Sequence, residues 1–166
     1  MRAGIAFGSN LGDRLEILRR ARACLLASPL LAPPILLSGI YLTSPVDCPA
    51  GSEPFLNSVL EAELTGDPVA LLRDLRACER GLGRPARSPR NAPRVIDLDL
   101  LYAGDWNIKT DDLVLPHPQI AGRRFVLAPL AEIRPELILP GQSETVAQLL
   151  AKLPAGNSAE LLDAKW

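Results

Sequence analysis

Few residues in this chain are of the kinds that build zinc sites and disulfide frameworks. Its three cysteines, Cys24, Cys48 and Cys78, are widely spaced and form no Cys-x-x-Cys pair. Zinc-ligand spacing is therefore absent, and the odd number gives no disulfide framework. The single histidine, His117, has no second histidine or cysteine near it in the sequence, which also argues against zinc. We expect three scattered, buried thiols in a reducing cytoplasm.

The sequence also lacks a recognisable targeting or membrane-spanning segment. The N-terminus leads directly into Ile5-Ala6-Phe7 without a charged segment and a long apolar run, so no signal peptide is evident. Residues 24–42 are almost uncharged, but Pro29, Pro33 and Pro34 interrupt this stretch at its centre. Because proline breaks helices, we expect a helix end, a loop and a strand here rather than a membrane span.

Neither sign of charge dominates the chain. The net charge is −1, from 18 basic and 19 acidic residues, which argues against a general nucleic-acid or membrane-surface binder. There is no Gly-x-x-x-x-Gly-Lys-Ser/Thr loop and no protein-kinase motif set. Any phosphate would therefore be bound by metal ions and arginine rather than by a glycine-rich cradle. Arginines do cluster along residues 80–94, at Arg80, Arg84, Arg87, Arg90 and Arg94.

The order of strand and helix signals predicts a single α+β domain. Asp13 and Asp67 are typical N-caps, and each is followed by apolar residues at helical spacing. The resulting order strand–helix–strand–strand–helix–strand is the split βαβ, ferredoxin-like arrangement, an antiparallel sheet with helices packed on one face. The strands are expected at about 4–9, 36–42, 57–64 and 95–102.

C-terminal additions are expected beyond this core. Residues 124–132 and 144–153 have the pattern of two further helices. Nothing repeats and no domain boundary is evident, so residues 1–166 are expected to form one domain with its core at about 4–153. The residues after Pro154 are expected to be loosely held.

Two carboxylates on one predicted strand are the most informative feature of the sequence. Asp97 and Asp99 alternate with apolar residues, so a strand places both carboxylates on one face. Aspartate is a poor strand residue, and a pair on one face indicates a hard divalent cation, or two cations about 4 Å apart, that bind a polyphosphate. The arginines just before the strand favour metal-dependent phosphoryl chemistry. An amphipathic strand with one wet face is the alternative.

The same segment resembles a known family. Residues 90–101 follow the pattern Arg-x-Ala-Pro-Arg-x-x-Asp-Leu-Asp-Leu-Leu, which is similar to the signature of the 6-hydroxymethyl-7,8-dihydropterin pyrophosphokinase family. The resemblance extends over about residues 4–150 and implies the same α+β core. It also implies a folate-pathway enzyme that transfers diphosphate from ATP to the pterin alcohol and releases AMP. Its further matches are Gly8-Ser9-Asn10-Leu11, Phe55-Leu56-Asn57, Pro116-His117, Arg123 and Phe125.

The resemblance assigns the charged residues to ATP and to metal. Both aspartates are the implied ligands of two Mg²⁺ ions, with ATP as co-substrate. Without the resemblance, the arginine-rich loop could be merely solvated and the histidine could be a surface residue. The implied catalytic residues are Arg84, Arg94, Asp97 and Asp99. The implied nucleotide-binding residues are Arg84, Arg94, His117 and Arg123.

The resemblance also implies a pocket for the flat pterin ring. Phe55 and Phe125 would sandwich the ring, which is a favourable stacking geometry, although in isolation either phenylalanine would be assigned to the core. Asn57 can offer donors and an acceptor to the ring edge, and main-chain groups at 43–46 would complete that edge. The implied substrate-binding residues are Thr43, Phe55, Asn57 and Phe125.

Four residues depart from the family pattern. Asn91 and Pro118 stand where relatives have aromatic residues, Ala92 where glycine is frequent, and Arg76 where some relatives have glutamine. Loss of the aromatic at position 91 would remove a stacking contact from the loop and leave the acids untouched. We assign the Gly8-Ser9-Asn10 segment to a strand-to-helix turn with no direct chemistry.

Two other classes of protein remain open from the residues alone. A metal-dependent nucleotidyl transferase also places paired aspartates on a strand of a ferredoxin-like palm. A requirement for a nucleic-acid template would favour it, but the nearly neutral net charge argues against it. A ferredoxin-like small-molecule sensor would bind its ligand without Mg²⁺ dependence or AMP release. The expected partners are ATP and a reduced pterin alcohol, with no nucleic acid, no membrane and no obligate protein partner.

Overall fold

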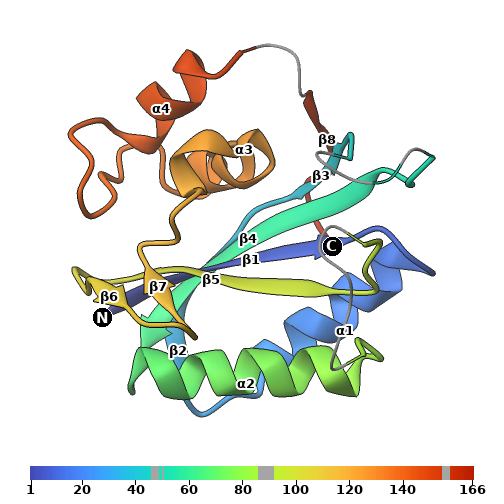
Figure 1. The fold of residues 1–166 in the computed structure, drawn as a ribbon, viewed down its shortest axis with the longest axis horizontal. Coiled ribbons are helices and arrows are strands. Elements are labelled where there is room, and N and C mark those ends of the chain that lie inside the picture. Colours follow the sequence, from blue (N-terminus) through green and yellow to red (C-terminus); the bar gives the residue numbers. More distant parts are fainter. Residues whose placement is uncertain (46–48, 50, 86–91, 155–157) are drawn as a thin grey trace.

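A six-stranded sheet, antiparallel at every pairing, forms the centre of the molecule (Figure 1). The computed structural model describes residues 1–45, 49, 51–85, 92–154 and 158–166. The helices are α1 (Arg14–Leu26), α2 (Pro68–Gly81), α3 (Arg124–Ile133) and α4 (Val146–Lys152), with a 3₁₀ turn at Ile120–Gly122. The strands are β1 (Arg2–Ser9), β2 (Leu31–Leu37), β3 (Ile40–Thr43), β4 (Phe55–Leu64), β5 (Asp97–Ala103), β6 (Ile108–Lys109), β7 (Val114–Leu115) and β8 (Ala159–Asp163).

The strand order places β1 at the centre of the site-bearing half of the sheet. The order is β5-β1-β4-β3-β8, and β2 also pairs with β4. β6 and β7 form a separate two-stranded hairpin. Because β1 lies between β4 and β5, the residues at its C-terminal end adjoin the starts of both neighbours.

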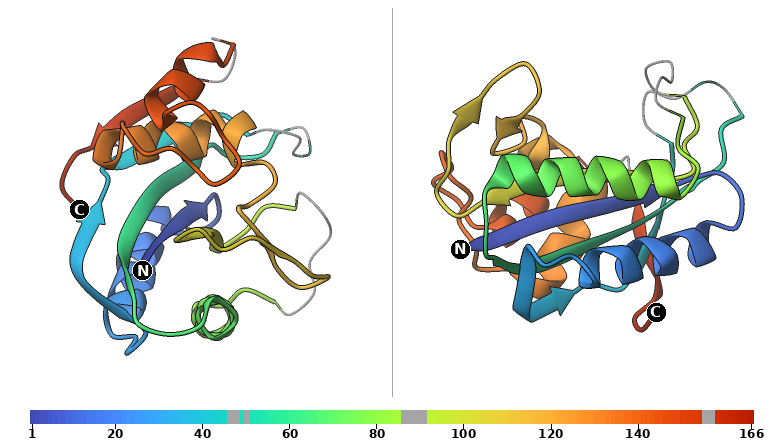
Figure 2. Two further views of the ribbon diagram at one scale, coloured as in Figure 1. Left: turned by 90° about the vertical axis from the view of Figure 1, so that its left-hand side faces the viewer. Right: turned by 90° about the horizontal axis from the view of Figure 1, so that it is seen from below.

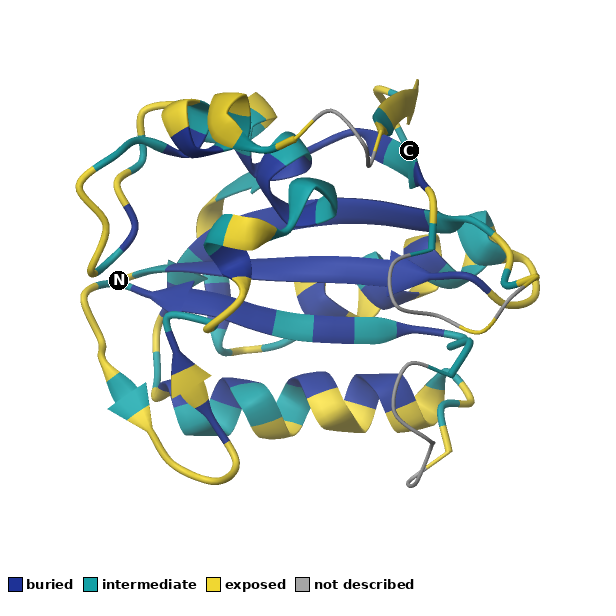
Figure 3. Ribbon diagram, turned by 45° about the horizontal axis from the view of Figure 1, so that its top comes forward, coloured by how far each residue is buried: buried dark blue, intermediate teal, exposed yellow. Residues whose placement is uncertain are grey.

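Helices cover both faces of the sheet (Figure 2). One core contains Ile5 and Phe7 of β1 and the buried sides of α1 and α2. The second core contains Ala6, between them in the sequence, and packs against α3 and α4. The expectation of helices on one face therefore holds only for α1 and α2. Adjacent residues of β1 alternate between two cores, so this strand is buried along nearly its whole length (Figure 3).

The predicted helix starts are confirmed. The Asp13 carboxylate accepts a hydrogen bond from Glu16 N at 3.1 Å, and the Asp67 carboxylate accepts one from Val69 N at 3.0 Å. Each bond satisfies one of the free N–H groups in a first helical turn. In α2, Leu75 is fully buried, whereas Leu72 is only partly covered.

The strand expected at 36–42 is divided into β2 and β3. Ser38 lies at the break, where its N–H donates to Val59 O at 2.9 Å and its hydroxyl accepts from Val59 N at 2.9 Å. A Cβ on Gly39 would lie 2.7 Å from the main-chain oxygen of Asp163. The close approach of the C-terminal segment therefore requires glycine at this break, which the hydrophobic pattern does not reveal.

The C-terminal segment differs from expectation. Instead of being loosely held, Ala159–Asp163 forms β8 and pairs with β3. Trp166 donates from Nε1 to Ser38 O at 2.9 Å and packs edge-on against Phe7 at 6.0 Å between ring centroids. Backbone pairing with the edge of β3 and partial burial of the Trp166 ring hold a segment whose composition alone suggests a tail.

Two remaining expectations concern cysteines and membranes. Cys78 is buried as expected, but Cys24 is exposed on α1, and Cys48 lies outside the described residues. Across the part of the chain that the structure describes, no helix combines the length and the apolar character that a membrane crossing needs.

Candidate active site

The two aspartates lie on one side of β5, as the strand period predicts. Leu98 and Leu100 are 4% and 3% exposed and belong to the core that faces α1 and α2. The side chains of Asp97 and Asp99 are 23% and 37% exposed. β5 thus buries its leucines and leaves both carboxylates partly exposed.

Gly8 forms the floor between the aspartates and the substrate-binding residues predicted on β4. In the sheet register it pairs with Asn57 on one side and with Asp97 on the other. A Cβ here would lie 3.3 Å from Asn57 Oδ1 and 3.8 Å from Phe55 Cδ1. The absence of a side chain therefore keeps this space open. Sequence reasoning assigned this glycine only to a turn.

Thr43, Phe55, Asn57 and Phe125 line a first cavity beside this floor. Asn57 is buried and donates from Nδ2 to the Thr43 hydroxyl at 2.7 Å, which fixes the orientation of its amide. Phe55 comes from the start of β4, and Phe125 comes from the first turn of α3. The structure thus brings together the four residues that the resemblance assigned to pterin binding.

Two arginines neutralise Asp97. Arg84 Nη1 donates to Oδ1 and Arg94 Nη1 donates to Oδ2, both at 2.6 Å. Arg84 also forms an ion pair with Glu79, whose Oε1 accepts a hydrogen bond from Leu98 N at 2.8 Å. The pKa of Glu79 is raised, chiefly by burial. Glu79 therefore anchors Arg84 between the end of α2 and the start of β5.

Asp99 is less well compensated than its neighbour. Among the described residues, its one ion-pair partner is Arg123, with 3.8 Å between Nη1 and Oδ2. Burial, followed by the negative charge of Asp97, raises the pKa of Asp99 to about 6. A second positive charge close to Asp99 would stabilise the ionised form of its carboxylate. Arg123 also lies over the ring of Phe125, with 5.4 Å from the guanidinium carbon to the ring centroid.

His117 lies between these groups and a second cavity. Its Nδ1 accepts a hydrogen bond from Gln119 N at 3.2 Å, so the neutral ring carries its proton on Nε2. Burial, and then the charge of Arg123, lower the pKa of His117. The imidazole is therefore held neutral with one N–H free to donate to an oxygen atom.

The second cavity lies between α2, β5 and the β6–β7 hairpin. Leu72, Leu113 and Val114 supply apolar surface, while Arg84 supplies positive charge. Asp97, Asp99 and His117 line both cavities. The two carboxylates therefore stand where the cavities meet.

The family departures fall on different walls of these cavities. Arg76 and Pro118 line the second cavity, and Arg76 pairs with Asp112 at 3.4 Å. Ala92 lines the first cavity, whereas Asn91 lies outside the described residues. The sequence pattern left Arg76 without a role because its neighbour in space is 36 positions away. Three further residues of predicted loops also lie outside the described residues, Val46, Arg87 and Arg90.

This geometry defines a class of protein, one with an aromatic-lined cavity and a second, highly charged cavity that share two carboxylates. Residues 4–135 match the sequence model of 7,8-dihydro-6-hydroxymethylpterin-pyrophosphokinase (HPPK), so the chain belongs to this family. The matched range contains every residue assigned above to the two cavities.

Individual relatives agree with this assignment. The 2-amino-4-hydroxy-6-hydroxymethyldihydropteridine pyrophosphokinase of Bacillus subtilis is 44% identical over 131 residues, covering 79% of this chain and 77% of that protein. The protein of the same name from Methylorubrum extorquens is 39% identical over 156 residues, covering 93% of this chain and 96% of its own length. The resemblance inferred from the sequence is thereby confirmed.

Solved structures show the same fold in a longer chain. The crystal structure of Plasmodium falciparum HPPK-DHPS with pteroate matches at a TM-score of 0.71 and 15% identity. The match covers 91% of this chain but 42% of that one. This chain therefore corresponds to one part of the Plasmodium protein, with the same mixture of helices and antiparallel sheet.

Proposed function

We propose that this chain transfers diphosphate from ATP to 6-hydroxymethyl-7,8-dihydropterin and releases AMP, in folate biosynthesis. The observation that carries the proposal is the position of Asp97 and Asp99 at the junction of two unlike cavities. One cavity suits a flat ring with hydrogen-bonding edges, and the other suits a base followed by phosphates. The reacting groups would then meet at the carboxylates.

The pterin is proposed to occupy the first cavity. Phe55 and Phe125 line this cavity from β4 and α3, and a flat ring bound here could stack on both. Asn57 already donates one N–H to Thr43, which leaves its Oδ1 and remaining N–H for the pterin edge. This arrangement would point the hydroxymethyl group toward Asp97 and Asp99.

ATP is proposed to occupy the second cavity. Leu72, Leu113 and Val114 offer apolar surface to the adenine ring, and Arg84 lies at the phosphate end. Arg94 and Arg123 reach the same carboxylates from the first cavity. Arginine suits phosphate because its planar fork can donate two parallel hydrogen bonds.

Mg²⁺ fits the donor set of the junction, and we propose two ions. Among the described residues, no group of three or more His, Cys, Asp or Glu side chains is placed to hold a metal. Two carboxylates suffice because Mg²⁺ usually takes its other ligands from phosphate oxygens and water. The raised pKa of Asp99 supports this assignment, since a cation would relieve its repulsion from Asp97. When bound, Mg²⁺ would neutralise phosphate charge and lower the pKa of the attacking hydroxyl.

The chain's own residues would act by positioning and by charge. The hydroxymethyl oxygen attacks the β-phosphorus and loses its proton to solvent, the bond from that phosphorus to the α,β-bridging oxygen breaks, and AMP leaves with that oxygen. Arg84 and Arg94 stabilise the charge that spreads over the transferred oxygens, and His117 donates its Nε2–H to a phosphate oxygen. The phenylalanines hold the attacking alcohol in line, so that binding geometry supplies much of the rate.

Two finer features belong to the same proposal. The order β5-β1-β4-β3 supports a ferredoxin-like core if β2 and β3 are counted as one interrupted strand, with α3 and α4 as C-terminal additions. A cytoplasmic location, with ATP and the pterin alcohol as the only obligate partners, is consistent with both substrates being small molecules.

One assay tests the proposal. The protein is incubated with ATP, Mg²⁺ and the reduced pterin alcohol, and the nucleotide products are separated by chromatography. Stoichiometric AMP and pterin diphosphate are expected. ADP as the product would indicate transfer of a single phosphate, and binding of pterin without nucleotide turnover would indicate a sensor.

A further inference from the structure

The C-terminal end of β1 and the residue after it have no chemistry assigned to them, yet they lie between the two halves of the site. Ser9 and Asn10 are 0% and 1% exposed, although both are polar. A buried amide is stabilising only when its donors and acceptor are satisfied. Its hydrogen-bond partners therefore indicate what Asn10 does.

Asn10 holds the arginine-bearing segment from one side. The side-chain Oδ1 accepts a hydrogen bond from Arg94 N at 2.7 Å, and the main-chain N–H of Asn10 donates to Arg94 O at 3.1 Å. The Ser9 hydroxyl adds a bond to Val95 O at 2.6 Å. Three hydrogen bonds thus fix the main chain at residues 94–95, immediately before β5 and its aspartates.

The other end of the same amide holds the segment that leads into β4. Asn10 Nδ2 donates to Glu53 O at 3.3 Å, and Arg14 Nη1 donates to Pro54 O at 2.6 Å. The next residue is Phe55, which lines the first cavity. The donor and the acceptor of one buried side chain therefore contact two segments that are about 40 residues apart in the sequence.

We infer that Asn10 is a positioning residue that fixes the spacing between Arg94 and Phe55, and so between the phosphate-binding and pterin-binding halves of the site. This inference rests on the function proposed above. An amide is suited to the task because one end must accept from an N–H and the other must donate to a carbonyl. Serine offers a single oxygen, and leucine offers neither group.

Replacement of Asn10 by aspartate tests the two side-chain contacts separately. Asn10→Asp keeps an acceptor for Arg94 N and removes the donor to Glu53 O. We expect its dissociation constant for 6-hydroxymethylpterin, measured by calorimetry, to rise about tenfold or more while kcat stays within about threefold of wild type. Asn10→Ala removes both contacts, so kcat should fall by a further factor of about 30 or more.

Ser38→Ala is the matched control. Ser38 is also a buried polar residue with several hydrogen bonds, but it lies at the β2–β3 break and lines neither cavity. Its replacement should lower the unfolding temperature, measured by circular dichroism, without changing kcat or pterin affinity.

The outcomes separate this inference from the proposed function. AMP formation by the wild-type protein in the same assay tests the function alone. If wild type turns over and both Asn10 variants bind pterin and react normally, the positioning role is wrong. A loss of kcat and affinity in Asn10→Asp by the same factor, as general destabilisation would give, also overturns it. If Asn10→Ala does not fold, the split between affinity and kcat in Asn10→Asp decides the question.

Discussion

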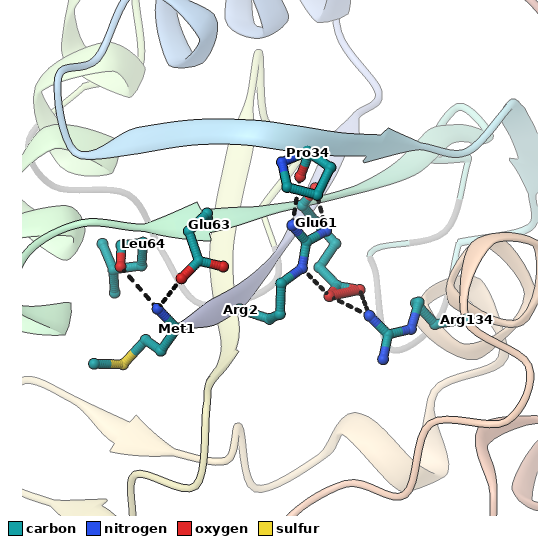
Figure 4. A network of polar contacts seen from close by, with 7 residues as sticks. All are labelled: Met1, Arg2, Pro34, Glu61, Glu63, Leu64 and Arg134. Carbon is teal, nitrogen blue, oxygen red and sulfur yellow. Dashed lines mark hydrogen bonds and ion pairs between the residues drawn. The ribbon is translucent and has the colours of Figure 1, made fainter.

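Glu61 and Asp97 each accept hydrogen bonds from two arginines, and β1 pairs with the first at Gly4 and with the second at Gly8. Around Glu61, Arg2 Nε lies 2.7 Å from Oε1, and Arg134 Nη1 lies 2.7 Å and 3.0 Å from the two carboxylate oxygens (Figure 4). The Glu61 side chain is 1% exposed, whereas that of Asp97 is 23% exposed. Two carboxylates with similar arginine partners therefore differ in their exposure to solvent.

The difference shows that access, rather than the pairing of opposite charges, distinguishes a site from a structural network. Glu61 lines neither cavity, and its arginines connect β1, β4 and the end of α3. Asp97 lines both cavities, so under the proposed function an incoming phosphate would take over the arginines that now neutralise it. A buried, saturated ion pair fixes structure, while an open one can exchange partners.

The largest expected effect comes from removing the charge of the two carboxylates at the junction of the cavities. Asp97→Asn and Asp99→Asn should remain folded and lose turnover by orders of magnitude, ~10³-fold or more, because a catalytic metal supplies several kcal/mol. Pterin binding without nucleotide should survive, as measured by calorimetry. Asp105→Asn, at an exposed carboxylate beyond the end of β5, is the control. Normal turnover of either site variant with Mg²⁺ would show that its aspartate is not a required ligand.

The next largest effect is expected from the two arginines that pair with Asp97. Arg84→Ala and Arg94→Ala remove charge that matters most when the phosphate is being transferred, so kcat should fall by ~10²–10³-fold and ATP affinity by much less. Binding of a non-hydrolysable ATP analogue gives the affinity. Arg80→Ala changes an exposed arginine of the same cluster and should leave both quantities unchanged. If the two site variants behave like this control, Arg84 and Arg94 neutralise Asp97 without contributing to diphosphate transfer.

The sequence made one of these regions predictable and the other not. Asp97, Asp99 and Arg94 lie close together in the chain, and the strand period alone places the acids on one face. Glu61 meets Arg2 and Arg134 across 59 and 73 positions, so no local pattern predicts the network. The same reason explains why the roles of Gly8 and Asn10 and the strand β8 were missed. Each depends on which segments the completed sheet places next to one another.

The structural role of the Glu61 network can be tested with the same kind of substitution, in which an amide replaces the carboxylate. Glu61→Gln leaves two arginines facing a neutral amide, so the free energy of unfolding should fall by ~3 kcal/mol, while kcat of the folded protein stays within about threefold. Denaturant titration measures the first quantity. Glu63→Gln, two positions along β4 in a half-exposed ion pair with the N-terminus, should cost less than ~1 kcal/mol. A large loss of kcat with little change in stability would mean that the Glu61 network belongs to the site.

The smallest predicted effect concerns α3, which connects the two regions. Its first turn places Phe125 in the first cavity, and the residue at its C-terminal cap, Arg134, binds Glu61. Phe125→Ala should weaken pterin binding by ~1–3 kcal/mol and leave nucleotide binding largely unchanged, because stacking and burial of one aromatic ring are lost.

Phe125 also packs against the second core, so Phe125→Leu is the informative companion. Leucine keeps apolar contact with that core but cannot stack on a heterocycle or support Arg123. If stacking is the function, calorimetry should show both variants losing pterin affinity while Phe125→Leu keeps the wild-type unfolding temperature. Recovery of full affinity by leucine would instead assign Phe125 to the core, and the pterin would then need another partner opposite Phe55.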